Sequence, residues 1–276
     1  MDLINGSRCV VGFAEMRGRR DYMEDRVDIQ LNKKNGFSYF GVYDGHGGDV
    51  VSDFLKKHLS PKIFDLTENP DTIGDKINDV VSSIDVDINQ TYPIDRTTGS
   101  TCVGALLNET PTDGHYPLKI FNIGDSRAMI IEKNGNLRIN TLDHKPNDQN
   151  ERERVEKAGG HVYWGRVDSM LAVSRAFGDW TFKNNSDLSW KEQKVTVLPD
   201  IYQTTLKPGE LLVLTSDGLF ENTTDAAICH FIHQALEEKQ AINLNEIADR
   251  LLKWAHGVNY SKDNLSVILV LIPESV

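Results

Sequence analysis

Three consecutive residues, Asp44, Gly45 and His46, place a carboxylate, a backbone carbonyl and a titratable ring on one turn. The preceding run, residues 37–43, is rich in aromatic and β-branched residues and predicts a strand that the following glycines break. Because Gly45 has no side chain, its carbonyl is open to a ligand. This combination suits a hard metal ion with a proton donor beside it. For this segment alone, an ordinary Asp-Gly turn with a surface histidine is the alternative.

Carboxylates recur at the ends of other apolar runs. Asp125 and Asp217 each follow such a run, Asp263 precedes one, and Glu24 and Asp25 precede another. Each of them alone is most simply a turn residue. Gathered at strand ends, however, they would repel one another and raise one another's pKa values. A divalent cation removes that repulsion, and oxygen-only ligands favour Mg²⁺ or Mn²⁺ over structural zinc.

Two other chemistries find less support. Cys229, His230 and His233 could suggest zinc, but on a helix such residues are more simply packing and surface positions. No Gly-x-x-x-x-Gly-Lys-Ser/Thr loop is present, so the sequence does not support nucleotide binding.

The elements that must position these residues are strands interrupted by helical pairs. Strands are predicted at Cys9–Ala14, Val27–Leu31, Phe37–Tyr43, Gly99–Leu107, Leu118–Ile123, Arg127–Ile131, Leu211–Thr215 and Leu265–Ile272. Helices are predicted at Val50–Leu59, from an Asn69–Pro70 start to Ile88, at Glu151–Ala158, Thr224–Glu237 and Leu244–His256. Residues 180–194 show no period and are interpreted as a surface excursion. Regular β-α-β alternation is missing, so a layered α+β fold is expected.

Composition narrows the class of protein. The chain has 276 residues, 39% of them hydrophobic and 26% charged, as in globular proteins of one or two domains. A net charge of -11 argues against nucleic acid as a partner. Three widely spaced cysteines indicate reduced thiols, and the longest apolar run, Val267–Ile272, is too short to cross a membrane. We therefore expect a cytoplasmic or nuclear protein with no membrane partner.

The carboxylates belong to an ordered series of motifs. The series is Tyr-Met-Glu24-Asp25, Val-Tyr-Asp44-Gly45-His46-Gly-Gly, Gly99-Ser-Thr101, Asn-Ile-Gly-Asp125-Ser-Arg, Asp143-His-Lys-Pro146, Ala158-Gly-Gly, Leu171-Ala-Val-Ser-Arg175-Ala-Phe-Gly-Asp179, Thr-Ser-Asp217-Gly-Leu-Phe and Asp263-Asn264-Leu-Ser-Val. It resembles the metal-dependent serine/threonine protein phosphatases of type 2C from about residue 9 to residue 272. Each motif alone is weakly specific, whereas the ordered set is very specific.

The resemblance implies an α-β-β-α sandwich, in which two antiparallel sheets lie face to face with a helix pair outside each. It also implies a single catalytic domain over residues 9–273, with residues 180–194 as a flap-like excursion beside the site. The coarse pattern agrees with this fold but does not reach it alone.

For the metal centre, the resemblance implies two Mn²⁺ or Mg²⁺ ions at one end of the sandwich. Asp44 would bridge them, Glu24 and the Gly45 carbonyl would complete one ion's protein ligands, and Asp217 and Asp263 would serve the other. The ions would activate a water for in-line attack on phosphorus.

Arg20 matches the phosphate-binding arginine of the family, and His46 is the candidate general acid for the departing serine or threonine oxygen. A solvated surface charge and a core or surface histidine are the respective alternatives. Five further residues match positions of the family pattern. We interpret them as residues that support the site: Asp25, Thr101, Asp143, Ser174 and Arg175.

One position departs from the family pattern. Glu221 stands where a second aspartate is usual, four residues after Asp217. With Asp125, that position would hold a weaker third ion. The extra methylene moves the carboxylate by about 1.5 Å, one carbon–carbon bond length. Third-ion binding is therefore in question.

The leading hypothesis is a phosphatase that acts on phosphorylated protein substrates as a monomer. A catalytically silent family member that serves as a binding module should have lost core carboxylates, and this chain has not. A hydrolase of small phosphoesters would keep the metals and differ only in substrate.

Overall fold

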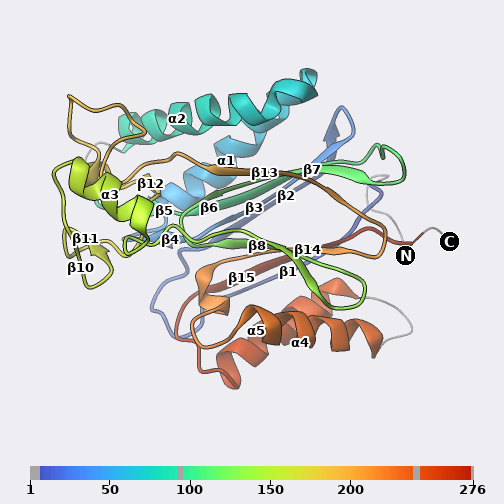
Figure 1. Cartoon of the computed structure of the whole chain (residues 1–276). Coiled ribbons are helices and arrows are strands. Elements are labelled where there is room, and N and C mark those ends of the chain that lie inside the picture. The colour runs from blue at the N-terminus through green and yellow to red at the C-terminus, as the bar shows by residue number, and fades with distance from the viewer. Residues whose placement is uncertain (1–6, 93–95, 239–242, 275–276) are drawn as a thin grey trace.

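The computed structural model describes residues 7–92, 96–238 and 243–274, and its main body is a four-layer sandwich (Figure 1). Two five-stranded antiparallel sheets lie face to face. Helices α1 (Val50–Asp65) and α2 (Ile73–Thr91) cover one sheet, and α4 (Asp225–Glu237) and α5 (Leu244–Gly257) cover the other. This confirms the α-β-β-α arrangement predicted from the sequence.

Each sheet combines strands from distant parts of the chain. The sheet covered by α1 and α2 is the upper one in Figure 1. Its strand order is β13 (Asp200–Leu206), β7 (Tyr116–Ile123), β6 (Cys102–Asn108), β3 (Phe37–Tyr43) and β2 (Arg26–Lys34). The lower sheet has the order β1 (Val10–Met16), β15 (Leu265–Leu271), β14 (Leu211–Thr215), β8 (Arg127–Ile131) and β9 (Leu137–Asn140). A small third sheet joins β12 (Phe177–Gly178), β5 (Gly99–Ser100) and β4 (Gly45–His46).

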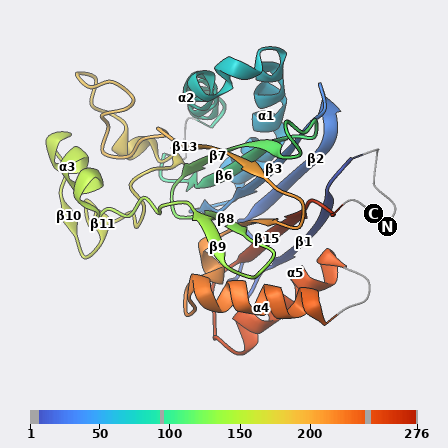
Figure 2. The same ribbon diagram turned by 45° about the vertical axis from the view of Figure 1, so that its right-hand side comes forward.

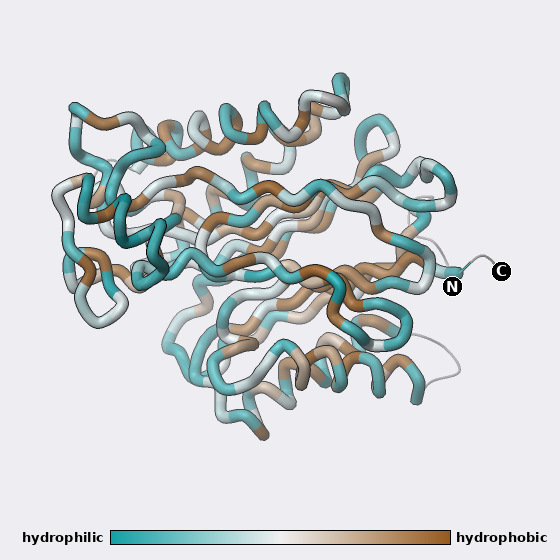
Figure 3. The backbone as a smooth tube through the Cα atoms, viewed as in Figure 1, coloured by the Kyte–Doolittle hydropathy of each residue, from teal (hydrophilic) through white to brown (hydrophobic). Residues whose placement is uncertain are grey.

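Strands β3 and β15 are buried along their whole length. Burial on both faces explains why β15 is almost entirely apolar, and hydrophobic stretches recur along the strands between the helix layers (Figure 3). In β3, Tyr39 and Tyr43 pack under α1 and α2, whereas Phe40 and Val42 point between the sheets. Successive side chains of a strand point to opposite faces, so one strand serves two hydrophobic layers.

The sandwich thus has three hydrophobic layers, and each contains one free, buried cysteine. Cys102 lies between the upper sheet and its helices, Cys9 between the two sheets, and Cys229 between the lower sheet and its helices. In the lower layer, Gly12 of β1 lets α5 approach closely, because a Cβ there would lie 2.2 Å from the Leu244 backbone.

A smaller subdomain projects beyond one end of the sandwich (Figures 1 and 2). It contains α3 (Gln149–Lys157) and the hairpin of β10 (Val162–Tyr163) and β11 (Arg166–Val167), with a small core of its own. Residues 180–194 contain only the short 3-10 helix Trp180–Phe182 and otherwise form irregular backbone.

Two helix boundaries differ from the sequence-based prediction. Helix α1 continues past Pro61 to Asp65, because Ile63 and Phe64 gain buried positions in the upper layer. Asn69 and Pro70 open a separate 3-10 turn, and α2 itself begins at Ile73. Among the described residues, none of the helices has the length and apolar character needed to span a lipid bilayer.

Candidate active site

One end of the sandwich holds a cavity of about 260 Å³ in which most of the predicted site residues meet. It is lined by Arg20, Glu24, Asp44, Gly45, His46, Gly47, Thr101, Asp125, Arg166, Leu171, Ala172, Val173, Asp217 and Asp263. The cavity lies at the end of the molecule near β4 and β5, on the left in Figure 1, and the described chain ends lie at the opposite end.

Antiparallel pairing brings these residues together. Strand β14 ends where its partner β15 begins, since Leu211 pairs with Leu271 and Thr215 with Val267. Asp217 and Asp263, just beyond those strand ends, therefore reach the same rim of the lower sheet. Strands β3 and β7 end at the same side of the molecule (Figure 1), which places Asp44 and Asp125 there as well.

The carboxylates at this rim repel one another strongly. Removal from bulk water and the neighbouring charge of Asp25 raise the pKa of Asp44 well above its ordinary value. Burial and the charge of Asp125 raise the pKa of Asp217 to about 7. Burial also raises the pKa of Asp25, which does not line the cavity, to about 6. Both Asp25 side-chain oxygens are buried, and neither has a hydrogen-bond partner among the residues that the structure describes.

Cationic side chains balance two of the acids. The Arg20 guanidinium lies 2.7 Å from an Asp263 oxygen, and the Lys145 ammonium contacts Asp125. In residues 7–92, 96–238 and 243–274, no three histidine, cysteine, aspartate or glutamate side chains converge into a ready-made metal cage. The donor set is nevertheless all oxygen and strongly anionic, which fits hard divalent cations in chemical type.

The structure does not bring Asp125 and Glu221 together. Asp125 lines the cavity, whereas Glu221 lies outside it and accepts hydrogen bonds from the Lys262 backbone at 2.6 Å and the Ser261 hydroxyl at 3.1 Å. The structure therefore does not place Glu221 in the cavity wall beside Asp125, where the predicted third ion would need both carboxylates. Thr101 holds the turn itself, since its N–H donates to the Asp44 carbonyl at 2.9 Å.

The residues of the alternative zinc site have packing and surface roles. Cys229 belongs to the lower hydrophobic layer, and His233 faces Glu237 one turn along α4 at 3.4 Å. His230 is exposed on the same helix.

His46 is half-buried at the edge of the cavity and contacts a buried carboxylate. Its Nε2 lies 2.7 Å from Oδ2 of Asp179. Burial lowers the pKa of His46, but the charge and hydrogen bond of Asp179 outweigh it, so the net pKa lies above its ordinary value.

Two cations at the site were missed by the sequence analysis. Lys145 lies in the Asp143-His-Lys-Pro motif, and its sequence context alone gives it no role. Arg166 lines the cavity from β11, in a stretch where neither period nor motif distinguished it. Only the fold brings this hairpin residue into the cavity wall.

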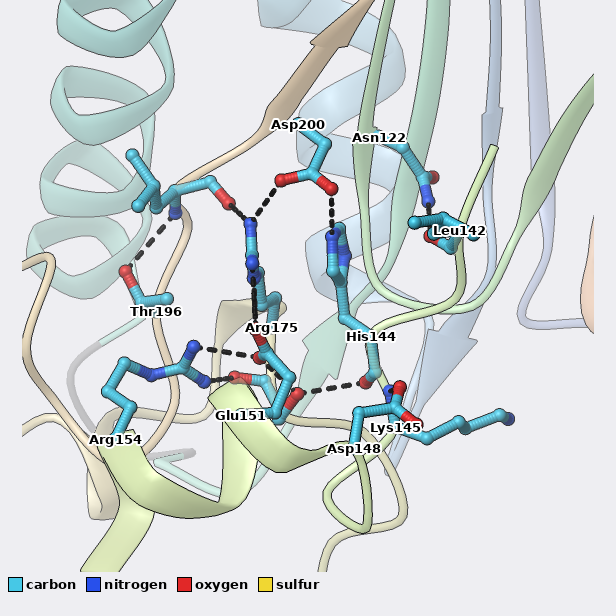
Figure 4. A network of polar contacts seen from close by, with 12 residues as sticks. Asn122, Leu142, His144, Lys145, Asp148, Glu151, Arg154, Arg175, Thr196 and Asp200 are labelled. Atoms are coloured by element: carbon cyan, nitrogen blue, oxygen red, sulfur yellow. Dashed lines mark hydrogen bonds and ion pairs between the residues drawn. The ribbon is translucent and has the colours of Figure 1, made fainter. Parts of the chain in front are cut away.

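A buried ion network anchors α3 beside the cavity (Figure 4). Glu151 accepts hydrogen bonds from Arg154 at 2.7 Å, from Arg175 at 2.7 Å and from the Ser174 hydroxyl at 2.5 Å. Arg175 also reaches Asp200 at 2.9 Å. The network thus connects α3 to β13 and to the segment that contributes Leu171–Val173 to the cavity wall. Ser174 and Arg175 therefore have a structural role.

The Glu151 network should make stability depend on pH. Burial opposes ionisation, but Arg175 and Arg154 prevail and lower the pKa of Glu151 from 4.5 to about 2. A lowered folded-state pKa means that the carboxylate stabilises the fold above pH 4.5 and loses this effect as the pH falls toward 2. At pH 7 we expect Glu151→Gln to reduce the free energy of unfolding by about 3 kcal/mol.

Urea unfolding at pH 7 and pH 3 measures this effect. The gap between wild type and Glu151→Gln should shrink by more than half at the lower pH. Glu156→Gln, on an exposed position of the same helix, should show no such gap. A gap that stays constant with pH would show that Glu151 contributes through packing alone.

Comparison with known proteins places this geometry in a family. The family model described as protein phosphatase 2C matches residues 9–264. Probable protein phosphatase 2C 21 of Oryza sativa subsp. japonica is 31% identical over 278 residues, which cover 92% of this chain and 80% of that protein. Protein phosphatase 1B of Mus musculus is 32% identical over 292 residues, which cover 96% of this chain and 70% of that protein.

A solved structure agrees with these sequence matches. The crystal structure of a phosphatase from Toxoplasma gondii superposes with a TM-score of 0.87 at 29% identity, over 96% of this chain and 93% of that one. Since the family model spans most of the residues and the relatives cover nearly the whole length, the chain belongs to the protein phosphatase 2C family.

Proposed function

We propose that the protein hydrolyses phosphoserine and phosphothreonine in phosphorylated proteins, with a divalent-metal centre in the cavity. The observation that carries this proposal is the composition of the cavity wall. Oxygen ligands suited to hard cations share about 260 Å³ with Arg20, which can bind phosphate, and His46, which can donate a proton. The relatives' names, which are those of phosphatases, support the same reaction.

Five residues would hold two Mn²⁺ or Mg²⁺ ions: Glu24, Asp44, the Gly45 carbonyl, Asp217 and Asp263. When bound, such ions lower the pKa of a coordinated water and supply hydroxide near neutral pH. The repulsion among Asp44, Asp217 and their neighbours supports this assignment, because cations would relieve it.

Arg20 would orient the substrate. Its guanidinium is planar and can donate to two phosphate oxygens at once. In the structure it donates to Asp263, and its side chain is 54% exposed, so it is free to turn toward an incoming phosphate. His46 would protonate the departing serine or threonine oxygen.

The cavity also reconciles an acidic protein with an anionic substrate. The net charge of -11 would repel phosphorylated proteins, whereas bound cations together with Arg20 and Arg166 would make the cavity locally positive. We propose that residues 9–273 act as one catalytic domain.

Phosphate release from a phosphoserine peptide tests the proposal. We expect activity with Mn²⁺ or Mg²⁺, complete loss with EDTA and recovery when Mn²⁺ is added back. No phosphate release at any metal concentration, combined with failure to bind Mn²⁺ in calorimetry, would indicate a silent binding module. A higher kcat/KM on small phosphoesters than on phosphopeptides would indicate that small phosphoesters, and not phosphoproteins, are the substrate class.

A further inference from the structure

His46 and Asp179 form a pair across the small third sheet. Strand β4 ends with His46, β12 is followed by Asp179, and Gly99 of β5 lies between them, paired with His46 on one side and with Gly178 on the other. The distance from Nε2 of His46 to Oδ2 of Asp179 is 2.7 Å. Asp179 is only 1% exposed, whereas the His46 side chain is 28% exposed and lines the cavity. The carboxylate therefore approaches the ring from the protein interior.

The backbone at Asp179 is anchored from the side away from His46. Its backbone adopts the left-handed conformation, with φ of 52°, and its N–H donates to the Thr98 carbonyl at 3.0 Å. The N–H of Gly178 donates to Asp85 of α2 at 2.7 Å. Asp85 in turn forms an ion pair with Lys183 at 2.9 Å, and both of these side chains are about 5% exposed. A buried ion pair thus fixes the turn that presents Asp179.

The absence of a side chain at residue 99 makes this contact possible. A Cβ on Gly99 would lie 2.1 Å from Oδ2 of Asp179 and 2.6 Å from Nε2 of His46. Real Cβ atoms do not approach other heavy atoms so closely. Any larger residue would therefore push the carboxylate and the ring apart.

We propose that Asp179 is the positioning residue for His46: it accepts the Nε2 hydrogen bond, fixes the ring orientation and leaves Nδ1 as the atom that delivers a proton. This rests on the proposed phosphatase function. A carboxylate behind an imidazole selects one tautomer and one orientation, and both are needed for directed proton transfer.

The proton transfer can be written in full. Attack by water oxygen forms a new bond to phosphorus while the bond from phosphorus to the serine or threonine oxygen breaks. The electron pair of the broken bond stays on the departing oxygen, which takes the proton from Nδ1 of the imidazolium. The attacking water releases one proton to solvent. The ring keeps its Nε2 proton, shared with Asp179, and Nδ1 then regains a proton from solvent.

Leaving-group dependence separates this role from a structural one. An alkoxide needs the proton, whereas p-nitrophenolate departs as a stable anion without it. We expect Asp179→Asn to lower kcat on a phosphoserine peptide by about 10- to 100-fold, the size of general-acid effects at their lower end. The kcat on p-nitrophenyl phosphate should change less than about threefold by the same reasoning. Asp187→Asn, an exposed aspartate of the same segment, should change neither.

Two further variants keep the proposal falsifiable. Adding Asp179→Asn to His46→Gln should cost nothing more on the peptide, because Asp179 acts only through the ring. Should Asp179→Asn fail to fold, Gly99→Ala must show the same selective loss, with Gly257→Ala as its control, since a Cβ there meets nothing within 4 Å. Equal losses on both substrates, or no loss on either, would overturn the proposal.

A spectroscopic readout separates this proposal from the phosphatase assignment. In ¹⁵N NMR spectra at fixed pH, the Nε2 nitrogen of His46 should report a bound, hydrogen-bonded proton in the wild type and lose that signature in Asp179→Asn. Wild-type protein that shows the signature but hydrolyses neither substrate would refute the proposed function alone. Active protein whose His46 spectrum is unchanged by Asp179→Asn would refute the positioning role alone.

Discussion

Replacing Asp44 by asparagine is expected to lower kcat on a phosphoserine peptide about a thousandfold, which corresponds to about 4 kcal/mol of lost transition-state stabilisation. Asp44 stands at the end of β3 in the wall of the cavity, and it is the residue proposed to contact both ions. Asparagine keeps the size of the side chain but removes the negative charge that a shared ligand needs. Phosphate release measured across a Mn²⁺ titration gives the effect.

The same substitution, which lowers activity, should raise the thermal stability of the metal-free protein. With EDTA present, Asp44→Asn should melt at a higher temperature than the wild type, because it removes one charge from a crowded group of buried acids. With Mn²⁺ present, the wild type should gain stability and the variant should not. Asp187→Asn is the matched control. A variant that still binds two Mn²⁺ ions by calorimetry would contradict the bridging role.

Replacing Arg20 by alanine is expected to have the second largest effect on activity. Loss of two charge-assisted hydrogen bonds to the phosphate should cost about 2 to 3 kcal/mol of transition-state stabilisation. That corresponds to about a 30- to 150-fold lower kcat/KM on the phosphopeptide. Thermal stability should barely change, because the Arg20–Asp263 ion pair has an exposed arginine and such pairs contribute little.

Arg20→Ala should also tighten Mn²⁺ binding in the absence of substrate, since it frees Asp263 from its ion pair. Arg19→Ala is the control, because Arg19 is exposed on the same loop and does not line the cavity. If Arg19→Ala and Arg20→Ala lowered kcat/KM equally, the loop would act through its general charge. Arg20→Lys, which keeps the charge but loses the planar fork, should recover only part of the activity.

The sequence predicts the acids of the cavity wall and Arg20, but not Lys145 or Arg166, for a physical reason. Asp44, Asp125, Asp217 and Asp263 each adjoin a strand, and antiparallel strands of matched length bring their ends to a common rim. Arg166 has no such relation, because its place at the cavity depends on how the projecting subdomain packs.

The layers of the fold show a similar limit. Alternation in β3 and continuous apolar residues in β15 identify strands but not which sheet each one joins. Register and sheet order depend on contacts between residues far apart in the chain, such as Val10 with Leu271. The family resemblance, and not periodicity, predicted the sandwich. Periodicity also ended α1 near Pro61, where buried packing extends it.

The distribution of Cys9, Cys102 and Cys229 has a practical consequence. Each layer of the sandwich contains its own thiol, and all three are at most 4% exposed. A thiol-modifying reagent should leave the intact molecule untouched and label each site only when its own layer opens. Mass spectrometry of the labelled peptides would then rank the order in which the outer helix pairs and the central interface come apart, without introducing any foreign probe.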